Sequence, residues 1–196
     1  MERREMRSIN GNFEIREEAD DLIIEGHFAV FGSPYFIRKG YTEYIDKGAF
    51  KKTLEEGADV RALINHDATL VVGRTKAGTL ELKEDDKGLW GKIIINKDDT
   101  SAMDIHARVK RHDVDQCSFG FEIEDEEVKY LEDGSVQFHI KSVKLYEVSI
   151  CTFPAYEATS VQARSNDIKE IERNRLNLWK EQARAKLQKG KESNGD

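Results

Sequence analysis

Ser118 and Gly120, in the segment "DQCSFGFEI", have the residue types and spacing that could do chemistry. In an extended segment they share one face, whereas Phe119 and Phe121 share the other. The phenylalanine face is typical of a core, and a glycine in a strand often marks the close approach of another backbone or a ligand. The glycine face could therefore hold a substrate beside the hydroxyl, which makes Ser118 a candidate nucleophile. The simpler alternative is a strand that begins with small residues.

A serine nucleophile needs a general base, most often a neutral histidine within hydrogen-bonding distance. His66 is the candidate, because the apolar face of the strand predicted in "VRALINHD" ends in its imidazole. A side chain at a strand end is held rigidly and can face a cleft. A half-buried structural histidine is the alternative. His27 and His139 fall inside strand patterns, whereas His106 and His112 lie on or just after a charged helix, where we expect them to face solvent.

A third group should orient the imidazole and stabilise its charged form. Glu147 in "KLYEVSICTFPAY" is the candidate, because both faces of this predicted strand are largely apolar and an unpaired buried carboxylate is costly. A structural ion pair with a Lys or Arg would satisfy the same carboxylate. Asp67 is the rival third residue, although it directly follows His66 and would point to the opposite face of a continuing strand.

Other kinds of site have weaker patterns. His66, Asp67, His112 and Asp113 form two His-Asp pairs that could bind a metal, but no H-x-x-x-H or C-x-x-C spacing accompanies them. Cys117 could be a nucleophile, but it shares the face of the phenylalanines and is interpreted as a buried apolar residue. The sequence has no G-x-S-x-G motif and no phosphate-binding glycine loop. We therefore expect no metal and no cofactor.

The elements that must position these residues are mostly strands. Most of residues 8–153 consists of segments that alternate apolar and polar residues and are separated by turn-forming pairs. Many short, closely spaced strands predict a barrel or a sandwich rather than a βαβ sheet.

Helices are predicted at three places. Residues 47–57 indicate a short helix, and residues 98–113 indicate a second one with its cap at Thr100 or Ser101. Residues 166–190 are densely charged with a thin apolar stripe, which predicts a helix that docks weakly or on a partner. We expect the last residues of the chain to be disordered.

Composition limits the classes of function. The 196 residues are 38% apolar and 35% charged with a net charge of −7, which suits one domain with a core and an appendage. The acidic balance, without a long basic block in the body of the chain, argues against nucleic acid as a partner. Neither the apolar region of a signal peptide nor a membrane-spanning stretch is found. With two cysteines, reduced thiols are favoured over a disulfide framework, so we expect a soluble intracellular protein.

Several separate blocks resemble, in order, the prohead (procapsid maturation) protease family of tailed bacteriophages: "IEGHFAVFG", "YTEYIDKGAF", "LINHDATLVVGRTKAGTLEL", "CSFGFEI" and "LYEVSICTFPAYEATSVQARS". Together they run through residues 21–165. The resemblance implies a serine endopeptidase similar in fold to the herpesvirus assemblins, mainly β with helices (α+β), in which helices surround a closed or partly open β-barrel. It also implies a catalytic domain over residues 1–165, followed over residues 166–196 by a charged helix and a disordered tail.

The resemblance assigns roles to single residues. His66 corresponds to the histidine of the family's N-H-D block, Ser118 to the serine of S-x-G-F, and Glu147 to the acidic residue of L-x-E-V-S. These three would form a Ser-His-Glu triad. In assemblins the oxyanion donor is a backbone N–H shortly after the third residue, so the N–H of Ala155 or Tyr156 is the corresponding candidate here.

The resemblance also implies a biological setting. Such proteases are packaged inside the procapsid, cut scaffold or the N-terminal scaffolding segment of the major capsid protein, and often digest themselves. We therefore expect capsid or scaffold protein as partner, no nucleic acid or membrane partner, and action in the host cytoplasm inside the assembling procapsid; a homo-oligomer is left open. The C-terminal helix would dock on scaffold. The alternatives are a non-enzymatic capsid-assembly or scaffold-binding β-domain with the same fold, and a hydrolase of esterase type.

Overall fold

A computed structural model describes residues 5–11, 13–18, 20–153 and 157–192 of the chain. The chain divides into two compact units, Met1–Ser160 and Val161–Asp196, and each is described by itself. The strands of the first unit are β1 (Glu5–Asn10), β2 (Glu14–Glu18), β3 (Asp21–Val30), β4 (Tyr35–Arg38), β5 (Tyr41–Ile45), β6 (Arg61–Ile64), β7 (Asp67–Arg74), β8 (Leu80–Glu84), β9 (Gly88–Ile95), β10 (Gln116–Tyr130) and β11 (Val136–Cys151). Its helices are α1 (Lys51–Glu55), α2 (Thr100–Lys110) and the 3-10 turn η1 (Thr75–Ala77).

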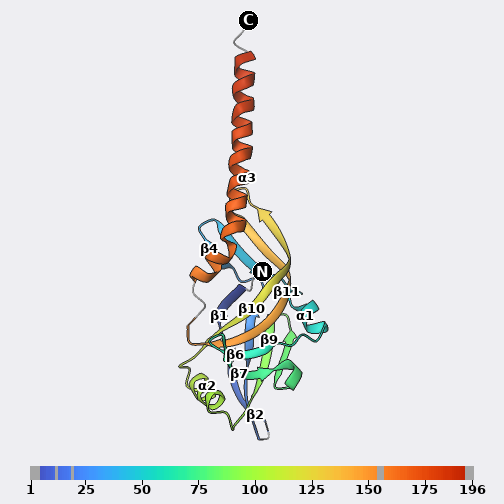
Figure 1. The fold of residues 1–196 in the computed structure, drawn as a ribbon, viewed down its shortest axis with the longest axis vertical. Helices are drawn as coiled ribbons and strands as arrows, with labels where there is room; N and C mark the ends of the chain where they lie inside the picture. Colours follow the sequence, from blue (N-terminus) through green and yellow to red (C-terminus); the bar gives the residue numbers. More distant parts are fainter. Residues whose placement is uncertain (1–4, 12, 19, 154–156, 193–196) are drawn as a thin grey trace. The chain divides into compact units, whose positions relative to one another are not determined.

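These strands form two sheets (Figure 1). In the seven-stranded sheet the neighbours are β1-β10-β11-β5-β4, and β6 pairs with both β11 and β7. The four-stranded sheet has the order β2-β3-β9-β8. The sheet-dominated α+β class is therefore confirmed. The expectation was a closed or partly open barrel. The closed form is wrong, because β3 and β9 pair within a sheet of their own and neither sheet closes on itself in the described residues. The herpesvirus-type arrangement stays a prediction.

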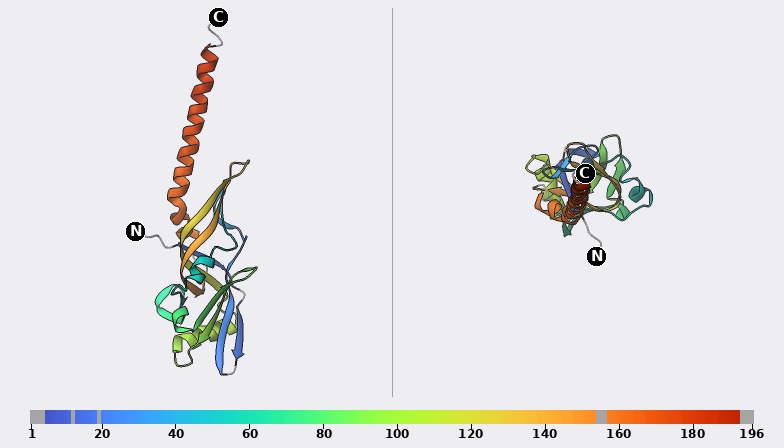
Figure 2. Two further views of the ribbon diagram at one scale, coloured as in Figure 1. Left: turned by 90° about the vertical axis from the view of Figure 1, so that its right-hand side faces the viewer. Right: turned by 90° about the horizontal axis from the view of Figure 1, so that it is seen from above.

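Strand β11 organises the larger sheet. Its 16 residues pair along their length with β10 as one long antiparallel hairpin, which both Figure 1 and Figure 2 show. On its other edge, residues 136–140 pair in parallel with β5, and residues 147–150 pair in parallel with β6. The alternation pattern had indicated two strands where the structure has this single one. Because the strand is continuous, it brings Glu147 next to β6.

The phenylalanine face of β10 is part of the core. Phe119 and Phe121 are buried, and their rings stack with centroids 4.9 Å apart. Phe50 packs edge-on against Phe119 at 5.5 Å. Cys117 lies in the same cluster and is fully buried. The predicted assignment of the two faces of β10 is therefore confirmed.

The two helices of the first unit lie at the periphery of the strands (Figure 1). Helix α1 is attached to β11 through a buried threonine. The Thr53 hydroxyl donates to the carbonyl oxygen of Val143 at 2.6 Å and accepts from the N–H of Leu145 at 3.2 Å. This contact fixes α1 on the strand that carries Glu147, two residues beyond Leu145.

Helix α2 differs from its prediction in two respects. Its cap is Asp99, whose carboxylate accepts from the N–H of Ser101 at 2.8 Å, so the cap lies one residue before the predicted Thr100. His106, expected to face solvent, is only 5% exposed. That expectation is wrong because α2 packs against strands of both sheets, and this covers more of its surface than the apolar stripe alone.

The second unit consists mainly of helix α3, Glu157–Glu192. A helix was predicted here from residue 166, so it begins earlier than the charge pattern indicated. The predicted domain boundary after residue 165 stays a prediction, and residues 193–196 of the expected tail lie outside the described residues. No helix in the described part of the chain is long and apolar enough to cross a membrane.

Candidate active site

His66 and Glu147 meet where β6 pairs with β11. The parallel register places Arg61 opposite Glu147 and Ile64 opposite Ile150, and His66 follows in the turn after β6. Its Nδ1 lies 2.6 Å from Oε1 of Glu147, and the two side chains are only 17% and 12% exposed. The structure therefore brings together two of the three residues predicted for the triad.

The turn that carries His66 has an unusual backbone. Asn65 and His66 have φ values of 51° and 62°, and Ile64 pairs with Asp67, so these two residues form a two-residue hairpin loop with both φ values positive, as in a type I′ turn. Asparagine and histidine are both enriched in this left-handed conformation among residues other than glycine, although it still costs such a residue roughly 1–3 kcal/mol. His66 was predicted at the end of a strand. It lies instead in the turn, and the turn rather than strand alternation aims its ring.

Asn65 ties this turn to the end of β11. Its N–H donates to the carbonyl oxygen of Ile150 at 3.0 Å, and its side-chain oxygen accepts from the N–H of Thr152 at 2.9 Å. Asn65 was not predicted as part of the site, although an asparagine before the candidate base is a signal for a left-handed turn.

The Glu147 carboxylate is bound at both oxygens. Oε1 faces His66, and Oε2 accepts from the hydroxyl of Ser149 at 2.6 Å. Gly120 lies directly opposite Glu147 on β10. Ser149 was not predicted as part of the site either. The signal for it is its spacing of two residues from Glu147, which places both side chains on the same face of the strand.

Ser118 lies on the neighbouring strand, directly opposite Ser149 on β11 and Ser8 on β1. Opposed residues share a face, so Ser118 is on the face that carries Glu147. Its side chain is fully buried, and its hydroxyl donates to the carbonyl oxygen of Arg7 on β1 at 2.9 Å. The hydroxyl therefore points toward β1, while His66 lies over β11. Ser118, the candidate nucleophile, therefore lies on the strand next to the one that carries Glu147. Its hydroxyl is hydrogen-bonded to Arg7 and not to the imidazole of His66.

The other ring nitrogen of His66 faces a thiol. Nε2 lies 3.8 Å from Sγ of Cys151, and burial, together with the charge of Glu147, raises the pKa of Cys151 to about 12. This thiol is protonated at neutral pH and is therefore a poor nucleophile. The contacts at Glu147 and Cys151 show that the imidazole runs along β11, above the position of Ser149.

The rival candidates have other surroundings. Asp67 accepts from both the N–H and the hydroxyl of Thr69, at 2.8 and 2.6 Å, and these bonds lower the pKa of Asp67. The thiol of Cys117 donates to the carbonyl oxygen of His27 at 3.2 Å, and burial raises the pKa of Cys117. Ala155 and Tyr156, the predicted oxyanion donors, lie outside the described residues. In the described ranges no three His, Cys, Asp or Glu side chains are grouped to hold a metal ion.

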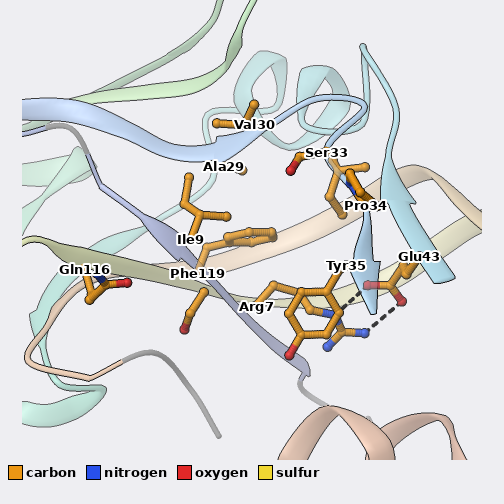
Figure 3. Close-up of a pocket in the computed structure, with 12 residues that line it drawn as sticks. Arg7, Ile9, Ala29, Val30, Ser33, Pro34, Tyr35, Glu43, Gln116 and Phe119 are labelled. Carbon is orange, nitrogen blue, oxygen red and sulfur yellow. Dashed lines mark hydrogen bonds and ion pairs between the residues drawn. The ribbon is translucent and has the colours of Figure 1, made fainter. Parts of the chain in front are cut away.

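A cavity of about 440 Å³ lies beside β1 and β10 (Figure 3). Phe119 and Ile9 line it, and at one end the guanidinium of Arg7 donates to Oε2 of Glu43 at 2.8 Å. Ser118, His66 and Glu147 are not among its lining residues, so this cavity is separate from the candidate site.

Known proteins resemble this chain over most of its length. The family model described as Caudovirus prohead serine protease matches residues 11–174, a range that contains the whole site. The prohead protease of Enterobacteria phage HK97 is 28% identical over 171 residues, which cover 82% of this chain and 72% of that protein. The solved structure of the bacteriophage T4 capsid assembly protease aligns with a TM-score of 0.49 and 11% identity, over 76% of this chain and 96% of that chain.

Proposed function

This chain belongs to the caudovirus prohead serine protease family, and we propose that it cleaves peptide bonds with Ser118 as nucleophile, His66 as general base and Glu147 as the residue that orients the base. The observation that carries the proposal is the contact of 2.6 Å between Nδ1 of His66 and Oε1 of Glu147. A carboxylate only accepts hydrogen bonds, so it holds the proton on Nδ1 and leaves the lone pair on Nε2. That tautomer is the one that can take a proton from a serine.

The side chain of Ser118 must change its rotamer before its hydroxyl can react. Strand β10 lies between β1 and β11, and the hydroxyl now donates to Arg7 on the β1 side. A change to another staggered rotamer, about 120° away, would turn Oγ from β1 toward β11, the strand whose residues Glu147 and Cys151 contact the imidazole. Catalytic hydrogen bonds are often absent in a free enzyme and form only when substrate is bound. We infer that substrate binding accompanies this rotation.

The chemical steps follow from these positions. Oγ of Ser118 bonds to the substrate carbonyl carbon while its proton passes to Nε2 of His66. Nε2 then gives this proton to the departing amine as the C–N bond breaks, which leaves an acyl-enzyme. Nε2 then deprotonates a water molecule that attacks the ester carbonyl, and it returns this proton to Oγ as the C–O bond to Ser118 breaks. This releases the carboxylic acid product and restores Ser118. The N–H of Ala155 or Tyr156 is our candidate to stabilise the oxyanion, on the basis of the family resemblance.

The substrate we propose is capsid protein. The HK97 relative is called a prohead protease, which supports a role in capsid maturation. We propose that the chain cuts scaffold or the scaffolding segment of the major capsid protein, and also cuts itself, inside the procapsid in the host cytoplasm. Helix α3 would dock on scaffold. Removal of residues 166–196 should then keep peptide cleavage and reduce incorporation into procapsids.

The test is cleavage of purified capsid and scaffold proteins by the wild-type chain and by Ser118→Ala. We expect defined fragments with the wild type and none with the variant. Ser142→Ala is the matched control, because Ser142 lies on β11 and donates to Glu124 at 3.1 Å, away from His66. Processing by folded Ser118→Ala would overturn the proposal.

A second candidate function is a non-catalytic capsid-assembly domain. The full burial of Ser118 and its bond to Arg7 favour it, since both keep the hydroxyl away from a substrate. This alternative predicts that the wild type cleaves neither protein but binds one of them. An esterase would instead hydrolyse small esters and leave both proteins intact.

A further inference from the structure

We propose that Ser149 is a positioning residue that fixes the Glu147 carboxylate and, through it, the catalytic orientation of His66. This inference rests on the proposed function. Ser149 has no exposed surface, and its hydroxyl donates to Oε2 of Glu147 at 2.6 Å. It therefore acts on the oxygen that His66 does not use.

A mostly buried carboxylate needs more than one partner. An ion removed from water is costly unless hydrogen bonds replace its hydration, and a carboxylate offers acceptor sites on both oxygens. In the described part of the chain, the hydrogen bonds to this carboxylate come from Nδ1 of His66 and from the hydroxyl of Ser149. Without the Ser149 hydroxyl, Oε2 would be left buried with an unmet acceptor, and the carboxylate would turn to find another donor.

Rotation of the Glu147 carboxylate would move His66 out of its catalytic orientation. Nδ1 of His66 is held by its hydrogen bond to Oε1 of Glu147. Nε2 of the same ring points along β11 and lies 3.8 Å from Sγ of Cys151. Ser149 lies between Glu147 and Cys151 on the same strand face and directly opposite Ser118. If the carboxylate rotates, the ring rotates with it and Nε2 leaves the side of the strand that faces the nucleophile. Ser149 thus sets the orientation of His66 through Glu147 and takes no part in the chemical steps.

The size of the effect follows from the type of bond. Hydrogen bonds to charged groups are the stronger ones, so we expect Ser149→Ala to lower kcat/KM for a peptide substrate by about 10- to 100-fold. The fluorophosphonate labelling rate at Ser118 should fall by the same factor. Ser142→Ala removes a β11 hydroxyl that also donates to a carboxylate, and it should leave both rates unchanged.

The decisive experiment combines Ser149→Ala with Glu147→Gln. If Ser149 acts only through the carboxylate, then its substitution in the Glu147→Gln background should change the labelling rate by less than about threefold. An equal loss in both backgrounds would mean a general structural role and would overturn the inference. Wild-type labelling rates in folded Ser149→Ala would overturn it as well. Failure of the wild-type protein to label at Ser118 would instead contradict the proposed function itself.

A spectroscopic readout is independent of turnover. In proton NMR, the His66 Nδ1 proton should give a low-field resonance in the wild type and in Ser118→Ala, and it should shift or broaden in Ser149→Ala. The resonance should be unchanged in Ser142→Ala. If Ser149→Ala does not fold, Ser149→Cys provides the same test, because a thiol of similar size is a weak donor. A low-field resonance unchanged in whichever variant folds would refute the positioning role.

Discussion

Gly120 lies directly opposite Glu147 in the β10–β11 hairpin, and a Cβ at position 120 would lie 2.6 Å from Oε1 of Glu147. The absent side chain of Gly120 is therefore the space that the carboxylate occupies. The glycine two residues after Ser118 was predicted to mark the close approach of a ligand or another backbone. In the structure the group that approaches it is the carboxylate paired with the candidate base.

We predict that Gly120→Ala lowers kcat/KM by at least about tenfold, because the methyl group must displace the carboxylate from His66, and that overpacking costs about 1–3 kcal/mol of unfolding free energy. Peptide hydrolysis and urea unfolding measure the two effects. Gly91→Ala on β9 is the control, since its Cβ would meet the Phe28 ring at 2.8 Å and should affect stability alone. Full activity in Gly120→Ala would show that the carboxylate position does not matter.

A second prediction separates the two candidate carboxylates. Glu147→Gln should reduce kcat by about 10⁴, the size of the loss for the triad carboxylate in a subtilisin-type enzyme. Asp67→Asn should leave kcat nearly unchanged, because Asp67 accepts its bonds from Thr69 in its own turn. Single-turnover kinetics on a peptide would measure both. A larger loss in Asp67→Asn would make Asp67 the third residue.

A third prediction concerns the left-handed turn at Asn65. Asn65→Val should lower the unfolding free energy by about 2 kcal/mol, because a β-branched residue is strained at positive φ. Asn65→Gly fits the backbone and is the matched variant that removes only the side-chain contact with Thr152. Equilibrium unfolding in urea compares them. Equal stability of the two variants would argue against strain in this turn.

A fourth prediction uses His106. Its burial, with a smaller contribution from Lys110, lowers the pKa of His106, while Glu17 acts in the opposite direction. The unfolded chain therefore binds a proton near pH 6.5 that the folded chain does not yet bind, so stability should fall as pH drops from 7.5 through 6.5. His106→Gln should remove this part of the pH dependence, as urea unfolding at several pH values would measure. If the stabilities of the wild type and His106→Gln change in parallel with pH, this prediction is wrong.

Much of the site followed from alternation in the sequence. Alternation separated Ser118 from the core face of Phe119, and the cost of burying a carboxylate singled out Glu147. These inferences are local, because side-chain direction in a strand repeats every two residues. They did not require knowledge of which strands are neighbours.

The rest depended on contacts distant in sequence. Parallel pairing of β6 with β11 brings together His66 and Glu147, which are 81 residues apart, and no local pattern specifies this pairing. The strand β1, which holds the Ser118 hydroxyl through Arg7, lies in a charged segment that was not predicted as a strand. The turn at His66 was missed because the residue after Asn65 is not the glycine that usually marks such a turn.

The assignment of Ser118 as the nucleophile can be tested by the site of fluorophosphonate labelling in the wild-type chain, read from the masses of its tryptic peptides. We predict one adduct, on Ser118, that is absent from Ser118→Ala and strongly reduced in His66→Gln. His27→Gln is the control, since His27 pairs with Asp85 at 2.8 Å outside the site and its loss should leave labelling intact. A folded wild-type chain that stays unlabelled, or is labelled at another residue, would contradict the assignment of Ser118 as the nucleophile.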